Sequence, residues 1–334
     1  MVGSGSVLMK YPLSHQKGIV LISVLLIVAI VALIAQQIMT RQSVSFKTSS
    51  LQIHQVQRQA LQMGIVQWLR QSLKGVNQLK SHHLNQTWAQ PMVSTAFAGA
   101  EVSGQLLDAQ AFLNLNSLGL SQEEPISKAW RSVWQRVAKD ENLPHNIDTL
   151  LQDWVDADNE AQPSGAESDV YRLKSTPYRT ADRPMVSSQE LTLLEGVSWA
   201  DYRRVQNWVV ALPERTAVNI NTASERVLVW LSPMITPQVA QEWIEWRKSA
   251  PAKDTESFRQ FLANAGGYEL EMIQKRLSDE LISVKTRFFL MNAQIQHSDL
   301  ETELFALFER ASTPNQQEIS VIQVWHSAYN ASTM

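Results

Sequence analysis

The stretch that decides the fold is KGIVLISVLLIVAIVALIA, residues 17–35. Residues 19–35 carry no charge, and Ser23 is their only polar side chain. At about 1.5 Å per residue, a helix over this run is about 26 Å long, close to the shortest length that crosses a bilayer. Because basic residues precede the run, we expect residues 1–18 in the cytoplasm and everything after about residue 36 outside, which is the periplasm of a Gram-negative cell. The sequence therefore predicts a single-pass inner-membrane protein.

Three interpretations of this start fit the residues. A secretory signal peptide would end in a small-residue cleavage site, for which Ala32 and Ala35 could serve. A plain signal anchor would remain uncut. A prepilin-type leader would be cut on the cytoplasmic side, between Gly18 and Ile19, and the segment resembles the start of the type IV pilin and pseudopilin superfamily. It departs from most members at the fifth position after the cut, where Ser23 replaces the usual Glu.

Helix-forming residues continue beyond the apolar run without a glycine or proline until Gly64. Many apolar residues among them, such as Val56, Met63 and Val66, are spaced by three or four. This spacing predicts one helix that leaves the membrane and reaches about Leu73. We expect the apolar stripe of its aqueous half to pack on the protein's own globular body rather than to serve only a partner.

Composition excludes several function classes. The 334 residues leave room for two or three domains after the membrane segment. There is no cysteine, which excludes disulfides, thiolate metal sites and cysteine nucleophiles. The formal net charge of −3 gives no overall basic field that would recruit nucleic acid. His82 and His83 could bind a metal, but no third ligand lies nearby in sequence, so we expect a solvated turn there.

Strand patterns occur at two distant places in the chain. Residues 93–107 are typical of a strand or hairpin, and alternating segments after residue 281 predict three strands separated by polar turns. Short amphipathic helices are predicted between these two places. Trp130 and Trp134 lie at helical spacing there, and we expect both in a core. The helices are therefore predicted to be an insertion into one sheet domain.

One segment of the helical region resembles a helix-hairpin-helix unit, a small fold that often binds DNA phosphates. The residues NINTAS cap a predicted helix over 225–231, and Thr236-Pro237 opens the next one. The DNA-binding version needs a glycine-rich turn with free backbone amides, but Pro233 lies in this turn and has no amide. A packing module is therefore predicted in preference to a phosphate-binding one.

An acidic stretch, DWVDADNEAQPSGAESDVYRL, covers residues 153–173. Pro163 and Gly165 interrupt it, so it is predicted to be largely loop. Crowded carboxylates repel one another unless a hard cation such as Ca²⁺ gathers them. A solvated acidic loop and the acid–base pair of a hydrolase remain alternatives. Its carboxylates are Asp153, Asp156, Asp158, Glu160, Glu167 and Asp169.

The chain as a whole resembles the K-type minor pseudopilins of the type II secretion system, the general secretion pathway protein K family. The resemblance covers nearly the whole chain and is most specific in two central blocks. Ser23 agrees with it, because K-type members characteristically lack the Glu of other pseudopilins at that position. The segments that agree in order are KGIVLISVLLI, DAQAFLNLNSL, DWVDADNEAQPSGAESDVY, SSQELTLLEGV and LPERTAVNINTASERVLVWL.

The resemblance implies an α+β fold. A pilin-like long N-terminal helix and a small antiparallel sheet would carry a large inserted all-α region of SAM-like or helix-hairpin-helix-like modules. The expected parts are a leader peptide (1–18), the transmembrane part of the helix (19–35), the pilin-like helix with the first strands (36–116), a first SAM-like insertion with the acidic loop (117–211), a second SAM-like module (212–280) and C-terminal strands completing the sheet (281–334).

The resemblance also implies a non-enzymatic role. Prepilin peptidase would cut after Gly18 and methylate the new Ile19 amine. The protein would form the pseudopilus tip with the I- and J-type minor pseudopilins and initiate assembly, working with the major pseudopilin and the inner-membrane assembly platform. The pseudopilus would export folded proteins across the outer membrane. No nucleic acid or small-molecule substrate is expected. A membrane-anchored periplasmic hydrolase and a DNA-uptake protein are the alternatives.

Two kinds of site residue follow from the resemblance. Family members bind calcium in the globular part, which implies a structural Ca²⁺ held by Asp156, Asp158, Glu167 and Asp169, with Asp153 and Glu160 as further candidates. Ser23 is the expected assembly residue. A subunit with no neighbour above it would leave a Glu at this position unpaired in the membrane, which is costly.

Overall fold

The computed structural model describes residues 16–73, 76, 79–97, 99–118, 125–297, 300–310 and 318–327. The basic part of the expected leader, residues 1–15, lies outside them. The chain divides into two compact units, Met1–Ile65 and Val66–Met334, and each is described by itself.

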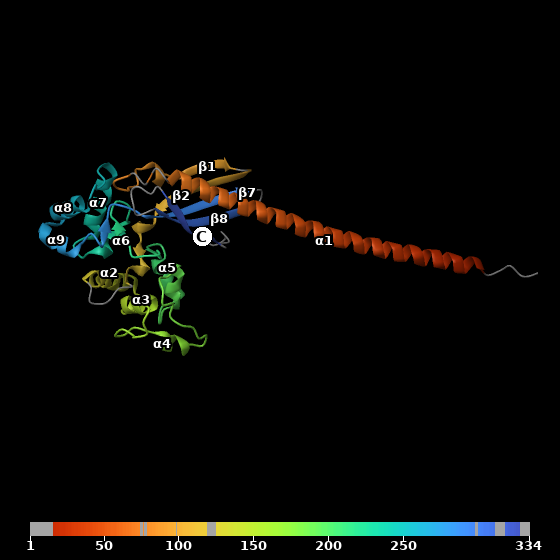
Figure 1. Cartoon of the computed structure of the whole chain (residues 1–334), viewed down its shortest axis with the longest axis horizontal. Coiled ribbons are helices and arrows are strands. Elements are labelled where there is room, and N and C mark those ends of the chain that lie inside the picture. The colour runs from red at the N-terminus through yellow and green to blue at the C-terminus, as the bar shows by residue number, and fades with distance from the viewer. Residues whose placement is uncertain are drawn as a thin grey trace, which may run out of the picture. The chain divides into compact units, whose positions relative to one another are not determined.

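The long N-terminal helix is α1, Gln16–Ser72, drawn in red and orange in Figure 1. The predicted single helix, from the apolar run to about Leu73, is confirmed. One part of it, Val20–Ser49, is long and apolar enough to cross a membrane by its length and composition. Beyond this span Val66 and Leu73, which belong to the second unit, are buried as expected. For Val56 and Met63, which belong to the first unit, packing on the globular body stays a prediction.

Five antiparallel strands form the sheet, in the order β1-β2-β7-β8-β9. Gly104 of β2 is required by this pairing, because a Cβ there would overlap the backbone of Asn292 on β7. β2 ends at Asp108 and its neighbour β7 begins at Phe288, so the predicted insertion of helices into one sheet is confirmed. The strands are β1 (Met92–Phe97), β2 (Ala100–Asp108), β7 (Phe288–His297), β8 (Leu300–Arg310) and β9 (Ile319–Ser327).

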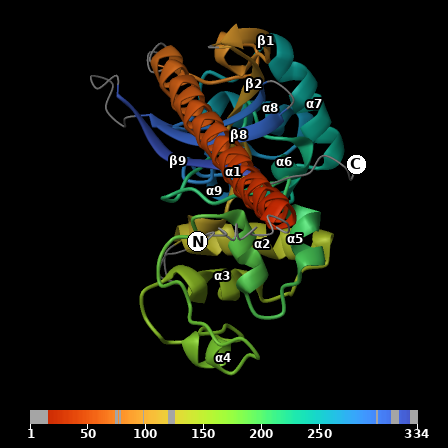
Figure 2. The same cartoon turned by 90° about the vertical axis from the view of Figure 1, so that its right-hand side faces the viewer.

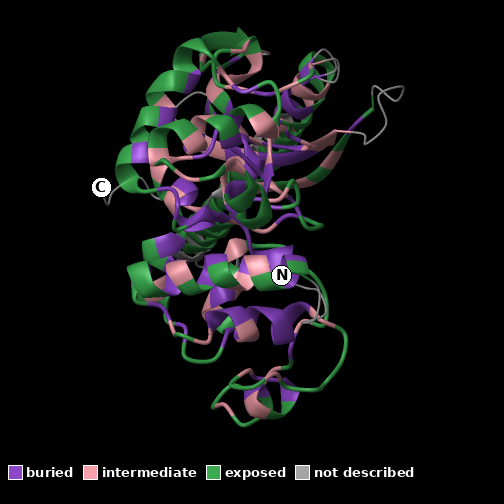
Figure 3. Cartoon of the chain, turned by 90° about the vertical axis from the view of Figure 1, so that its left-hand side faces the viewer, coloured by how far each residue is buried: buried purple, intermediate pink, exposed green. Residues whose placement is uncertain are grey.

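The inserted helices form two groups, with the second above the first in both Figure 1 and Figure 2. They pack on each other, and Arg136 of the first group donates to the carbonyls of Trp230 and Leu231 in the second. The buried tryptophans lie inside these groups, as expected for Trp130 and Trp134, and Figure 3 shows buried residues within the helices and along the sheet. The first group holds α2 (Pro125–Glu141), α3 (Ile147–Val155), α4 (Ser168–Arg172) and α5 (Trp199–Val205). The second holds α6 (Glu225–Leu231), α7 (Pro237–Ser249), α8 (Thr255–Gly266) and α9 (Leu270–Arg276). Short 3-10 turns cover Thr87–Ala89, Ala109–Ala111, Leu115–Leu118 and Ser188–Leu193.

Each helical group, or module, is closed by a pair of two-residue parallel strands. In the first module β3 (Leu113–Asn114) pairs with β4 (Val209–Val210). In the second module β5 (Val218–Asn219) pairs with β6 (Ile282–Ser283). The first strand predicted after residue 281 is therefore two strands, because residues 282–283 pair with β5 before the chain enters the sheet at β7.

Both modules also share an Asn-x-Asn motif at the opening strand. Asn114 and Asn219 each accept a hydrogen bond from the backbone N–H of the second asparagine, at 3.1 and 3.0 Å. The second asparagine then clamps a distant loop. Asn116 accepts from the N–H of Met185 (2.8 Å) and donates to the Met185 carbonyl (2.9 Å). Asn221 does the same with the N–H and carbonyl of Ala252, both at 2.9 Å. The two modules are thus built on one local plan; their expected SAM-like character stays a prediction.

The helix starts of the second module agree with the sequence. Ser224 caps α6 by accepting from the N–H of Val227, and Thr236 caps α7 by accepting from the N–H of Val239. In the turn between them the N–H of Met234 donates to the Ser232 hydroxyl, and the N–H of Ile235 donates to the Ser232 carbonyl. These amides are already bonded and buried, so the turn serves packing rather than phosphate binding.

His82 was expected in a solvated turn, but the structure buries it. Its ring is fully buried, and Nδ1 accepts the N–H of Thr286 at 3.0 Å. Burial, with a smaller effect from the charge of Arg310, lowers the pKa of His82 to about 4. The ring lies edge-on to Phe289 of β7, with 5.8 Å between ring centroids. His82 is therefore a neutral part of the core beside the sheet.

Asp108 forms a second buried polar group, at the point where β2 passes into the insertion. Its carboxylate accepts from the Asn219 amide (2.7 Å), the Thr222 hydroxyl (2.6 Å) and the N–H of Gln110 (2.8 Å). The Thr286 hydroxyl donates to it as well. Burial raises the pKa of Asp108, and these donors oppose that rise. The network joins β2 to the opening and closing segments of the second module.

Candidate metal centre

The acidic loop is held between two helix ends. α3 ends at Val155, and Asp156 follows as its C-terminal cap with its N–H bonded to the Gln152 carbonyl. Glu167 precedes α4 as its N-terminal cap. Asp158 lies between them, and oxygens of Asp156, Asp158 and Glu167 all come within 4.8 Å of one another. The fold therefore gathers three of the predicted carboxylates at one point.

Asp153 organises the loop from inside. Its side chain is fully buried and accepts the N–H of Gln162 at 3.1 Å, with a further backbone hydrogen bond from Ala166. Gly165 passes so close that a Cβ there would overlap the Asp153 carboxylate. The predicted role of Asp153 as a ligand stays a prediction, and in this structure its oxygens fix the course of the loop.

Three oxygens of the cluster lack the partners that buried oxygens normally have. Both carboxylate oxygens of Glu167 and Oδ1 of Asp156 are buried without a hydrogen-bond partner among the residues that the structure describes. A buried polar atom without a partner costs about 1–3 kcal/mol, and more when it is charged. Oxygen atoms of carboxylates are the ligands that Ca²⁺ prefers. The residues present therefore fit a hard cation.

Electrostatics of the cluster point the same way. Burial first, and then the charges of Asp153 and Asp156, raise the pKa of Glu167 to about 7. Burial and the charge of Asp158 raise the pKa of Asp156 to about 6. At carboxyl groups with such raised pKa values, protons and cations compete for the same oxygens. Near neutral pH, a divalent ion is the natural counter-charge for this group.

The remaining predicted ligands do not join the cluster. Glu160 is exposed, and its N–H donates to Asp158 Oδ1 at 2.9 Å. Asp169 is exposed on α4 and accepts the N–H of Val170 at 2.8 Å. Asp182 was not predicted, yet its charge raises the pKa of both Asp156 and Glu167. Its N–H donates to the Trp154 carbonyl (3.2 Å), a contact across a long loop that no local sequence pattern signals.

The segments that match known protein families coincide with the two modules. Two family models described as "Type II secretion system (T2SS), protein K" match residues 111–214 and 218–284. A type II secretion system protein K from Pseudomonas aeruginosa is 30% identical over 306 residues, covering 88% of this chain and 89% of the relative. The chain belongs to the type II secretion system protein K family.

Further members extend the match to almost the full length. The protein K of Pectobacterium carotovorum is 26% identical over 336 residues, covering 95% of this chain and 98% of the relative. Among solved structures, a chain of the GspK–GspI–GspJ complex of the enterotoxigenic Escherichia coli type 2 secretion system aligns with a TM-score of 0.67 and 24% identity. That alignment covers 85% of this chain and 100% of the other, and it establishes that the two share a fold.

Proposed function

We propose that this protein is a minor pseudopilin of the type II secretion system that forms the pseudopilus tip with I- and J-type minor pseudopilins and initiates pseudopilus assembly. Membership of the protein K family over nearly the whole chain is the observation that carries the proposal. The solved relative is in a complex named for GspK, GspI and GspJ. The role is non-enzymatic: the protein assembles and positions, and the filament beneath it exports folded proteins.

The aqueous part of α1 supports partner binding. Ile53, Val56 and Met63 are 57%, 64% and 67% exposed, and they recur at the three- and seven-residue spacings of a helix-packing stripe. Apolar side chains in such a row are stabilised when a second helix covers them. We assign this stripe to the helices of the partner pseudopilins.

The start of α1 supports processing. The proposed cleavage bond, between Gly18 and Ile19, lies in the first turn of α1. Prepilin peptidase would cut there and methylate the Ile19 amine. Mass spectrometry of the mature protein should then find methylated Ile19 as the first residue. An intact leader, or a cut near Ala35, would contradict the pseudopilin proposal.

Ser23 supports a place at the tip. Its hydroxyl donates to the Val20 carbonyl at 2.9 Å, so its polar group is bonded within its own helix. A Glu at this position would instead need the amine of a neighbouring subunit, and the first subunit of a filament has no such neighbour. The helical insertion between β2 and β7 adds bulk that would block a subunit from stacking above. Ser23→Glu is expected to move the protein from the tip into the filament; tip-only placement would contradict this.

Orientation completes the proposal. We place the residues before the membrane span in the cytoplasm and the globular unit in the periplasm, anchored in the inner membrane beside the assembly platform and the major pseudopilin. A protease-accessibility assay on spheroplasts tests this: the globular unit should be digested without lysis. Protection until lysis would contradict the orientation.

Co-purification tests the partner proposal most directly. The full-length chain, expressed with its I- and J-type partners and extracted in detergent, should retain both. Val56→Ser combined with Met63→Ser should release them, whereas Gln55→Ser on another face of α1 should not. If the unaltered chain retains neither partner, the tip proposal fails.

We infer in addition that a structural Ca²⁺ is held by Asp156, Asp158 and Glu167, with Asp182 as a further candidate. The unpartnered buried oxygens of Glu167 and Asp156 support this assignment. The ion would neutralise the cluster and tie the end of α3 to the start of α4. Its role would be to fix the loop, so calcium should raise the melting temperature of the protein and a chelator should reverse that rise.

A further inference from the structure

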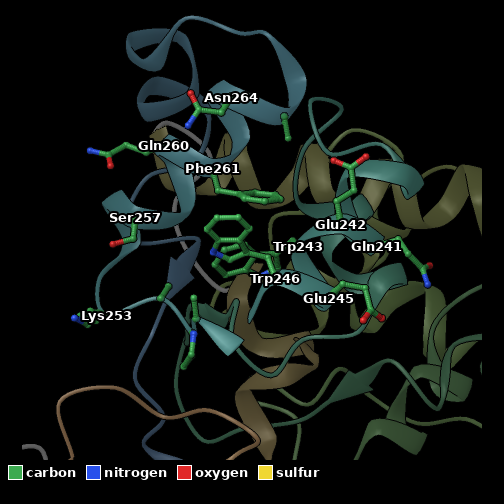
Figure 4. Close-up of a pocket in the computed structure, with 14 residues that line it drawn as sticks. Gln241, Glu242, Trp243, Glu245, Trp246, Lys253, Ser257, Gln260, Phe261 and Asn264 are labelled. Carbon is green, nitrogen blue, oxygen red and sulfur yellow. The ribbon is translucent and has the colours of Figure 1, made fainter. Parts of the chain in front are cut away.

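A groove of about 960 Å³ lies between α7 and α8 of the second module (Figure 4). On α8 it is lined by Ala265 and by Ser257, Gln260, Phe261 and Asn264, and the last four follow the spacing of a single helix face. The core face of α8 is a different one and carries Phe258 and Leu262, which are buried. The face that lines the groove is largely polar and opens to solvent, and half-buried Phe261 lies on it opposite Trp246 of α7.

The floor of the groove is aromatic. Trp246 is 57% exposed, and its ring centroid lies 5.8 Å from that of Phe261. Trp243 supports Phe261 from below at 5.0 Å, and its indole N–H donates to the Ile220 carbonyl at 2.9 Å. Figure 4 shows the three rings together at the centre of the groove. The rings are tilted, by 49° between Trp246 and Phe261 and by 58° between Trp243 and Phe261, so the exposed face of Trp246 is the flat apolar surface on which a ligand can stack.

The rim offers neutral polar groups. Gln241, Gln260 and Asn264 are exposed, and within the described part of the chain their side-chain amides make no hydrogen bond. The carboxylates of the rim are already engaged: Glu242 accepts from the Gln238 amide at 3.0 Å, and Glu245 is paired with Lys248 at 2.7 Å. Amides both donate and accept, so the free rim groups suit an uncharged ligand with hydroxyl or amide groups.

We propose that this groove binds a glycan of the N-acetylhexosamine type. A pyranose ring has an apolar C–H face that stacks on an aromatic side chain, and its hydroxyl and acetamido groups project sideways toward rim amides. Small-molecule sites combine an aromatic lining with a few convergent polar groups in the same way. A docking protein helix would bring charges that need partners, and the rim carboxylates have theirs. Lys253, exposed at the edge of the groove, suits a carboxylate carried by such a glycan.

The test uses the full-length chain in lipid nanodiscs, titrated with chitotetraose by isothermal calorimetry. Trp246→Ala should weaken binding about tenfold or more, the effect expected of a central aromatic contact. Trp246→Tyr should retain most of the affinity, because the stacking face remains. The matched control is Trp199→Ala on α5, which removes a similarly exposed tryptophan (51%) from the other module and should leave binding unchanged.

The rim is tested separately. Gln260→Ala with Asn264→Ala should weaken chitotetraose binding at an unchanged melting temperature. Lys253→Ala should weaken binding of solubilised peptidoglycan fragments, which carry carboxylates, but not of uncharged chitotetraose.

Three results would overturn the proposal. One is the absence of binding of both probes to the unaltered chain. Another is equal binding by the Trp246→Ala and Trp199→Ala variants. The third is loss of I- or J-type partner retention in Trp246→Ala while the unaltered chain binds no glycan, which would assign the groove to a protein. Because the titration needs no secretion partner, its failure is independent of the tip proposal.

Discussion

The two helical modules share a plan but stabilise their central loops differently. Both open with an Asn-x-Asn strand, close with a parallel strand and use the second asparagine as a clamp. In the second module the loop between α7 and α8 ends at Asp254, whose carboxylate accepts the N–H of Ser257 at 2.8 Å. In the first module the loop between α3 and α4 ends at Glu167, whose buried oxygens have no partner among the described residues. One loop closes with its own hydrogen bonds, and the other gathers carboxylate oxygens that have no such partner.

The asparagine clamps, Asn116 and Asn221, should contribute similarly to the stability of the two modules. Asn116→Ala and Asn221→Ala should each destabilise the protein by about 3 kcal/mol, because each leaves a buried backbone N–H and carbonyl unpaired. Urea unfolding measures the change. Asn264→Ala, at an exposed position, is the control and should change the free energy of unfolding by less than about 0.5 kcal/mol. If only one of the two substitutions lowers the free energy of unfolding strongly, the two clamps contribute unequally to stability.

Calcium should separate the modules. At one hundred times its dissociation constant, Ca²⁺ would add about 2.7 kcal/mol to the stability of the unaltered chain, seen as a higher melting temperature that a chelator reverses. Glu167→Gln or Asp156→Ala should abolish the shift. Asp169→Ala is the matched control, because Asp169 is exposed and outside the cluster. A calcium shift that survives Glu167→Gln, or is lost in Asp169→Ala, would place the ion elsewhere.

The pH dependence of the first module should run in an unusual direction. The folded-state pKa of Glu167, about 7, lies above its ordinary value of 4.5. Protonation therefore stabilises the fold fully below about pH 4.5, and this stabilisation is lost as the pH rises through 7. In chelator, the loss from Glu167 alone should be about 3 kcal/mol by pH 8, and the total loss should be smaller by about this amount in Glu167→Gln. Calcium should remove it in the unaltered chain; a flat profile in chelator would contradict the raised pKa.

The junction with the second module should show the opposite dependence. The pKa of His82 falls from 6.5 to about 4 on folding, so protons bind the unfolded chain first as the pH falls below 6.5. This residue alone should lower the free energy of unfolding by about 1.4 kcal/mol at pH 5.5. Comparing the unaltered chain with His82→Gln between pH 7.5 and 5.5 measures it. Equal slopes for the two proteins would show that His82 titrates normally.

Much of the fold could be predicted from local sequence patterns. The uninterrupted apolar run specified the long helix, Ser224 and Thr236 specified the starts of α6 and α7, and alternation specified the strands on either side of the insertion. Each of these features depends on neighbours within a few residues. The crowding of carboxylates in residues 153–169 likewise marked the metal-site candidate. Sequence therefore determined which elements form and which loop carries the unusual charge.

Tertiary structure decided which residues meet. The clamp from Asn116 to Met185 spans 69 residues, and the bond from Thr286 to His82 spans 204. The burial of His82, the convergence of Asp156, Asp158 and Glu167, and the approach of Asp182 all depend on such long-range contacts. The exposure of Trp246 depends on how α7 and α8 pack. Periodicity fixes the face of a helix on which a side chain lies, but burial and partners are fixed only when distant segments of the chain pack together.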